Sequence, residues 1–343
     1  MGYPSDREGT FRKLSKEGLT CVEGMLGKER FSFPSYQAEA AFSINSRSLI
    51  FNSIMKCISP IVSIHLLPHL EHAPGIRTMV QANSLCKALY VGTHPGQELR
   101  VFGWLTESKP DVFILTDGSG PKGRPRIDSS RETLKASGVV PGLLFGSHTD
   151  QAVYSRLVGH DGAFFVDLAE MIATHVLGRG INLLVAPTAD GFNPVQDAIR
   201  LVVDTACRLV AQQGGKHVEN MGIDLRGNPS EGVGDRLSRV VILQNDILER
   251  KLKLARAFEG LSDLADAELV KYGFESFRVE VLRRVTRPLM VPCVEPDYER
   301  HGSERVAAGL YPTVIRYSDH LAPVNWALRS HLERLYMPMS RAA

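Results

Sequence analysis

Residues 88–120, ALYVGTHPGQELRVFGWLTESKPDVFILTDGSG, have the pattern of a complete strand, loop, helix and strand. Residues 88–92 form a short apolar run, typical of a buried parallel strand. Residues 98–108 carry apolar side chains at helical spacing, and Pro110 ends that helix. Residues 111–116 are apolar again and predict a second strand. The stretch therefore predicts one unit of a parallel α/β sheet.

The same alternation continues along the chain. Apolar runs at 143–145 and 181–186 predict two further strands. Apolar residues at helical spacing predict helices at 131–137, 164–177 and 197–211. This order predicts an α/β fold that is Rossmann-like or doubly wound, with a mostly parallel sheet flanked by helices.

The character of the sequence changes after residue 213. A polar, glycine-rich linker is followed by segments for which we predict helices, at 243–261, 264–272, 274–284, 304–316 and 323–336. We therefore expect three parts. Residues 1–78 are an N-terminal extension of unknown role, 79–213 are the Rossmann-like core, and 214–343 are a linker and a mainly helical part that packs on the core.

The composition limits the possible functions less tightly than the strand and helix pattern limits the fold. The 343 residues carry a formal net charge of +2 with dispersed basic residues, so we expect a small-molecule or glycan substrate and no nucleic acid. The five cysteines are widely spaced and odd in number, which favours reduced thiols in the cytoplasm. Charged residues and prolines interrupt the apolar stretch 49–70, so no membrane span is expected. The sequence leaves the oligomeric state open.

Polar side chains follow the predicted strands at their carboxyl ends, where open α/β sheets bind ligands. Taken singly, each has an ordinary explanation as a turn or helix-capping residue. Together they predict one shared site at this edge of the sheet. The candidates are His94, Gln97 and Glu98, then Asp117, then His148 and Asp150, then Asp190, Gln196 and Asp197.

The usual cofactor and nucleophile motifs are missing from the sequence. No GxGxxG follows the first predicted strand, and neither GxxxxGK[ST] nor GxSxG occurs. Of the standard chemistries, metal-assisted hydrolysis fits these loops best, because it needs nitrogen and oxygen ligands, an open position for water and a carboxylate base.

Four of these runs, LYVGTHPGQE, FILTDGSG, LFGSHTD and VAPTADGFNPVQDAIR, resemble the LmbE-like or PIG-L family of zinc-dependent N-acetylglucosaminyl deacetylases. A later segment, YERHGSERVAAGLYPTVIRYSDH, is similar to the tail of one subgroup of that family. The resemblance covers residues 88–332 and rests on the order and spacing of all four strand-end motifs.

The resemblance implies a motif His-Pro-Asp-Asp-Glu, in which the histidine and second aspartate bind zinc and the first aspartate is the general base. A later histidine is the third ligand. In this sequence the histidine is His94 and the glutamate is Glu98, whereas the base position is Gly96 and the other two ligand positions are Gln97 and Gln196. Glutamine is a poor zinc ligand and glycine cannot act as a base.

Two main functions follow. The first is a hydrolase that removes an acyl group from an N-acylated sugar or related amide. In it, His94 would hold zinc with help from His148 or Asp150, and Asp117 or Asp150 would replace the base. The second is a catalytically inactive carbohydrate-binding or scaffold protein of the same fold.

A third possibility is a carbohydrate-active transferase that uses the same crevice without metal. Lys122, Arg124 and Arg126 lie in the loop after the second predicted strand, where they could meet a phosphate or carboxylate. Among the side chains near the crevice, we expect Arg126, Asp190 and Asp197 to contact the substrate.

Overall fold

The computed structural model describes residues 86–120, 123–233, 237–286 and 294–336. All of them belong to one compact unit, Ser63–Ala343. The predicted extension 1–78 and its boundary at residue 79 therefore lie outside the described residues, and both stay predictions.

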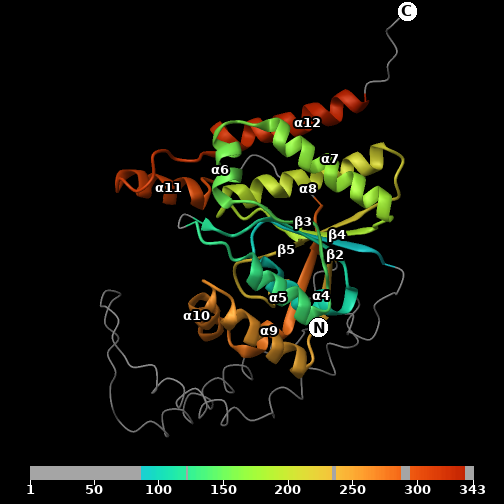
Figure 1. Ribbon diagram of the computed structural model, residues 1–343, viewed down its shortest axis with the longest axis vertical. Coiled ribbons are helices and arrows are strands. Elements are labelled where there is room, and N and C mark those ends of the chain that lie inside the picture. The colour runs from blue at the N-terminus through green and yellow to red at the C-terminus, as the bar shows by residue number, and fades with distance from the viewer. Residues whose placement is uncertain (1–85, 121–122, 234–236, 287–293, 337–343) are drawn as a thin grey trace, which may run out of the picture. The chain divides into compact units, whose positions relative to one another are not determined.

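A seven-stranded sheet lies at the centre of the described unit, with the strand order β3-β2-β1-β4-β5-β7-β6 (Figure 1). Neighbouring strands from β3 through to β5 are parallel, and β7 runs antiparallel to both β5 and β6. This mostly parallel sheet confirms the predicted fold class. The strands are β1 (Ala88–Gly92), β2 (Asp111–Thr116), β3 (Pro141–His148), β4 (Leu183–Pro187), β5 (Glu219–Ile223), β6 (Ser238–Ile242) and β7 (Val279–Arg284).

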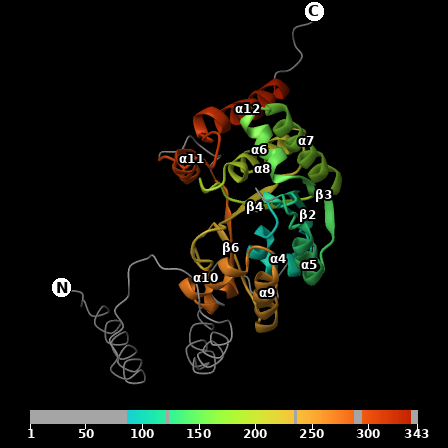
Figure 2. The same cartoon turned by 60° about the vertical axis from the view of Figure 1, so that its left-hand side comes forward.

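Helices cover both faces of the sheet (Figures 1 and 2). Because side chains alternate along a strand, Leu89 and Val91 join one hydrophobic core whereas Ala88 and Tyr90 join the other. The first core packs against α6 (Asp150–Val158), α7 (Gly162–Arg179), α8 (Pro194–Gln212) and α12 (Ala322–Tyr336), and the second against α4 (Phe102–Ser108), α5 (Ile127–Ser137), α9 (Asn245–Ala257) and α10 (Ser262–Tyr272).

Two helix predictions in the C-terminal part are wrong. Residues 274–284 form a short 3-10 turn, η4 (Phe274–Arg278), and then strand β7, in which Glu280 and Leu282 point into the core. A buried glutamate at a strand position hides the alternation that would have predicted a strand. The helix expected at 304–316 is α11 (Asp297–Ala307), which begins and ends earlier.

Three strands, β5 to β7, come from beyond residue 213 and extend the same sheet. The segment 214–343 is therefore helical for much of its length but also supplies sheet. No helix within the described ranges is both long enough and apolar enough to cross a bilayer.

The chain reverses direction across the sheet at β1. From β1 it proceeds to β2 and β3 on one side, and later to β4 and β5 on the other. The carboxyl ends of β1 and β4 therefore flank a topological switch point, where open α/β sheets bind ligands. His94 follows β1, and residues 188–193 follow β4.

Candidate functional site

His94 lies at this switch point and is held by three side chains. Its Nδ1 is 2.9 Å from Oδ1 of Asp150 and 3.0 Å from Oγ1 of Thr116. Its Nε2 is 3.2 Å from the side-chain nitrogen of Asn193. The imidazole is therefore fixed between the carboxyl ends of β1 and β2 and the first turns of α6 and α8.

Asp150 is buried at the start of α6 and is ionised. Burial alone would raise the pKa of its carboxyl group, but hydrogen bonds from His94, Thr116 and the Gly120 N–H hold that pKa well below its usual range. The second carboxylate oxygen accepts the Gly120 N–H at 2.7 Å. Because an ionised carboxylate can only accept, Nδ1 of His94 carries the proton between them.

Asn193 connects His94 to α8. Its side-chain oxygen caps the helix by accepting the backbone N–H groups of Val195 and Gln196, at 3.0 and 3.1 Å. Its amide nitrogen is then left to donate to Nε2 of His94. Asn193 is not among the site residues predicted from sequence, although an asparagine before Pro194 is a recognisable cap signal.

The two glutamines at implied ligand positions bind each other. Nε2 of Gln97 donates to Oε1 of Gln196 at 3.0 Å. Oε1 of Gln97 accepts the backbone N–H groups of Thr93 and His94, at 2.8 and 3.1 Å, so both of its lone pairs are engaged. Nε2 of Gln196 donates to the carbonyl of Thr188 at 2.8 Å. The two amides thus tie the turn after β1 to the loop after β4.

Gly96, at the implied base position, is covered by another part of the chain. Its φ is +99°, a left-handed conformation that favours glycine. A Cβ atom placed there would lie 2.4 Å from Cδ1 of Leu261 and 3.4 Å from the ring of Phe258. A carboxylate side chain has no room at this position while Leu261 stays in place.

Glu98 is fully buried beneath the turn and does not reach His94. Burial raises the pKa of its carboxyl group to about 7, although a hydrogen bond from the Gly96 N–H opposes the rise. That N–H lies 2.8 Å from Oε2. Glu98 therefore supports the turn from below and is poorly placed to touch a ligand.

Two other predicted site residues bond within their own loop. The carboxylate of Asp117 accepts the backbone N–H of Ser119 at 2.9 Å, which is turn chemistry. Nε of Arg126 donates to the carbonyl of Gly118 at 2.8 Å. These contacts shape the loop after β2, and the roles predicted for both residues stay predictions.

His148 does not join His94 and Asp150. Its ring packs edge-on against Phe164 of α7, with 5.3 Å between ring centroids. Burial and the positive charge of Arg156 lower the pKa of this histidine. It is the last residue of β3, and its ring packs on the helical layer.

Asp190 and Asp197 organise the loop after β4. One oxygen of Asp197 accepts the backbone N–H groups of Asp190 and Gly191, at 3.1 and 3.4 Å. Burial and the charge of Asp190 raise the pKa of Asp197 to about 7. Asp190 in turn accepts the Phe192 N–H at 3.0 Å. The observed contacts of both carboxyl groups are therefore with this loop.

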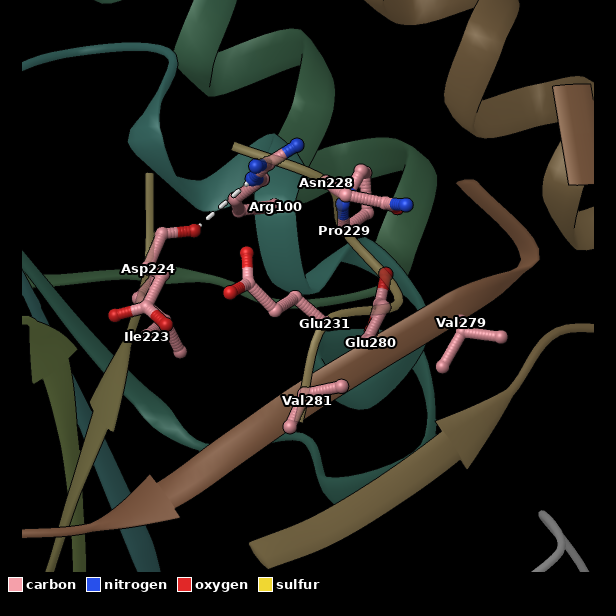
Figure 3. A pocket seen from close by; sticks show the side chains of 9 residues that line it. All are labelled: Arg100, Ile223, Asp224, Asn228, Pro229, Glu231, Val279, Glu280 and Val281. Carbon is pink, nitrogen blue, oxygen red and sulfur yellow. Dashed lines mark hydrogen bonds between the residues drawn. The ribbon is translucent and has the colours of Figure 1, made fainter. Parts of the chain in front are cut away.

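A small cavity is lined by residues of the short 3-10 helix η2 (Gln97–Val101), the end of β5 with the segment after it, and β7 (Figure 3). Its volume is about 20 Å³, which suits one water molecule. Arg100, Asp224, Glu231 and Glu280 are among its lining residues, and Nε of Arg100 donates to the carbonyl of Asp224 at 3.0 Å. The candidate residues predicted from sequence do not line it.

No family model and no curated protein matches this chain. Two solved structures show a distant likeness. A triple mutant of a deacetylase involved in teicoplanin biosynthesis (Orf2*T) is 13% identical, with a TM-score of 0.40, over 59% of this chain and 98% of its own. The zinc-inhibited form of teicoplanin deacetylase Orf2 is 11% identical, with a TM-score of 0.34, over 58% of this chain and 99% of its own.

The side chains at the three implied ligand positions do not fit a zinc ion. Zinc binds cysteine sulfur, histidine nitrogen or carboxylate oxygen, whereas these positions provide one imidazole and two amides that are bonded to each other. Within the described ranges, no three His, Cys, Asp or Glu side chains cluster in a way that could hold a metal ion. The zinc site that the resemblance implies is therefore altered in its donor atoms.

Proposed function

We propose that this protein binds a small polar ligand, such as a sugar derivative, at the switch point between β1 and β4, and that it does not hydrolyse amides through zinc. The observation that carries the proposal is the hydrogen bond between the Gln97 and Gln196 amides. It engages the two positions that would have to supply zinc ligands. A catalytic zinc typically needs three protein ligands and an open position for water.

Exposed aromatic residues on segments that adjoin the partners of His94 support a sugar-like ligand. Phe192 directly precedes Asn193, and Tyr311 is close enough to Tyr154 to influence its pKa. Phe192 and Tyr311 are 55% and 46% exposed, so both offer ring surface to solvent. Binding sites for small molecules combine such aromatic surface with a few polar groups that fix the ligand's orientation.

Metal analysis tests the first half of the proposal. After incubation with zinc and dialysis, we expect the full-length protein to retain less than about one tenth of an equivalent. The double substitution Gln97→Asp and Gln196→His supplies zinc-binding donors and is the matched comparison. One equivalent of zinc in the unmodified protein, lost on His94→Ala, would overturn the proposal.

Calorimetry with the methyl glycoside of N-acetylglucosamine tests the second half. We expect measurable binding that weakens when Phe192 and Tyr311 are replaced by alanine. Trp326→Ala on α12 is the control, because Trp326 is also an exposed aromatic residue but lies on a different element. Binding that is equally unaffected by all three substitutions would place the ligand elsewhere.

One observation favours a second candidate, hydrolysis without metal. The ionised Asp150 orients the proton of His94 at Nδ1, which leaves Nε2 as a base. In such a reaction water attacks the amide carbon, its proton passes to Nε2, the C–N bond breaks and the leaving amine takes the proton. Nε2 must first release Asn193.

Acetate release in the presence of EDTA distinguishes the two candidates. Turnover of an N-acetylated sugar that is lost in both His94→Ala and Asp150→Asn would establish the metal-free hydrolase. Ligand binding without acetate release would support the binding function and reject the hydrolase.

A further inference from the structure

The pair of helices α9 and α10 lies on the face of the sheet that also carries α4 and α5 (Figures 1 and 2). The two helices are joined by residues 258–261, which reach the turn after β1. This connection places two apolar side chains, Phe258 and Leu261, directly over Gly96. It therefore covers the turn that follows His94.

The contact at Gly96 depends on the absence of a side chain there. A Cβ at this position would be only 2.4 Å from Leu261, so the Leu261 side chain packs directly on the backbone of the glycine. Phe258 is buried, yet it lies outside both core clusters of the described residues. Its burial comes in part from the same turn, since its ring lies 3.4 Å from the Cβ position of Gly96.

Helix α10 is weakly attached to the rest of the unit. Of its 11 residues, Leu269 is the one that is buried. Leu264 and Val270 are 56% and 85% exposed. By contrast, α9 buries Ile247, Leu248, Lys251 and Leu252. Because few apolar contacts hold α10, we expect it to open locally at a lower free-energy cost than the core helices.

A glycine in the left-handed conformation stands at each end of α10. Gly260 has a φ of +76° and Gly273 a φ of +77°. A Cβ at Gly273 would meet no described atom within 4 Å, so the backbone there is unobstructed. Hinges are a few residues at element ends that absorb changes in φ and ψ, and these two glycines satisfy that requirement.

Polar contacts also hold the closed arrangement, and they include a 2.8 Å hydrogen bond from Arg256 of α9 to Asp266 of α10, both of which are more than one third exposed. Glu259 is 3.5 Å from Arg124, and because these side chains are 48% and 80% exposed, solvent screens the pair. The backbone N–H of Glu259 donates to Oγ of Ser129 at 3.3 Å. Glu268 of α10 lies 3.6 Å from Arg100, which is the least exposed of these ties.

We propose that Leu261 and α10 form a lid, closed in this structure by Leu261 on Gly96, which swings on Gly260 and Gly273 to admit the ligand. The lid movement itself is independent of the proposed function. Its effect on ligand affinity rests on that function.

Hydrogen exchange on the full-length protein tests the lid directly. Leu261→Ala removes this contact with Gly96, and we expect amides 96–99 to exchange about tenfold faster. Leu264→Ala, an exposed position on the same helix, is the matched control and should leave these amides unchanged. Unchanged exchange at 96–99 in Leu261→Ala, or equal acceleration in Leu264→Ala, would overturn the lid.

Calorimetry with the methyl glycoside of N-acetylglucosamine tests the consequence for binding. In Leu261→Ala the closed lid makes fewer contacts, so opening it costs less free energy. We therefore expect this variant to bind the glycoside about threefold to tenfold more tightly than the unmodified protein. Faster exchange with unchanged affinity would show that the lid does not gate this site. Faster exchange with no binding in either protein would retain the lid and reject the proposed function.

Discussion

The side-chain amide of Gln97 donates a 3.0 Å hydrogen bond to that of Gln196, which lies 99 residues further along the chain. One partner belongs to the turn after β1 and the other to the first turn of α8. Because the oxygen of Gln97 also accepts the backbone N–H groups of Thr93 and His94, this single side chain positions the backbone that carries the imidazole.

Replacing Gln97 by alanine should therefore destabilise the protein. The substitution leaves the Thr93 and His94 N–H groups and the Gln196 oxygen without this partner, and each unsatisfied buried group costs about 1–3 kcal/mol. Urea unfolding at pH 7 measures the change. Gln213→Ala, at an exposed helix end, is the control, and a Gln97→Ala protein as stable as this control would contradict the prediction.

Asp150→Asn should change how stability depends on acid pH. The folded pKa of Asp150 lies below its unfolded value of about 3.9, so its ionised form stabilises the protein above about pH 4 and this contribution is lost as the pH falls further. We expect the unmodified protein to lose more stability than Asp150→Asn between about pH 5 and 2. Urea unfolding across this range measures the loss, with the exposed Asp128→Asn as control. The prediction would be contradicted if the free energy of unfolding changed equally with pH in the unmodified protein and in Asp150→Asn.

Glu98→Gln should have the opposite pH dependence. The folded pKa of about 7 lies above the ordinary value of 4.5, so stability is full below pH 4.5 and falls as the pH rises to about 7. Glutamine cannot ionise but can still accept the Gly96 N–H. We expect Glu98→Gln to be more stable than the unmodified protein at pH 8 by up to about 3 kcal/mol, and similar at pH 4. Thermal unfolding at both pH values would refute this if the difference were the same at each.

The buried pair of Lys251 and Glu280 should contribute to the stability of the core that contains α4 and α9. Their charged atoms are 2.8 Å apart, and Glu280 also accepts the backbone N–H groups of Gly103 and Trp104 at the start of α4. Lys251→Met strands a buried carboxylate and should cost about 3–5 kcal/mol. Adding Glu280→Gln removes the charge and keeps one of the two acceptor oxygens. We expect the double variant to unfold at higher urea than the single one, and the reverse order would count against this account.

The parallel strands β1 to β4 were predictable because they are apolar runs that end in polar turns, whereas the parallel strand β5 lies in the segment predicted as a polar linker and was missed. β1 and β2 have the predicted bounds, and α12 (Ala322–Tyr336) begins one residue before the expected helix. β7 was missed because Glu280 occupies a core position, which only its pairing with Lys251 makes tolerable. That pairing depends on tertiary contacts, and a single sequence does not show it.

The candidate site was partly predictable for a similar reason. His94 and Asp150 both follow strands, and the common edge of a parallel sheet brings them together. His148 ends β3 and packs on Phe164 instead, whereas Asp150 opens α6, and the change of element between them is not visible in the strand pattern. The cover supplied by Leu261 could not be foreseen, since it comes from a distant helical pair whose docking no local pattern encodes.

The central position of β1 in the sheet has a consequence for the order in which the chain folds during synthesis. On one side β1 pairs with β2, which follows closely, but on the other Ala88 pairs with Leu183. As the chain leaves the ribosome, β1 must therefore wait with one edge bare until β4 has been synthesised. Asn193 and Gln196 are synthesised just after β4, so the hydrogen bonds that they make with His94 and Gln97 can form only when the two halves of the sheet have joined.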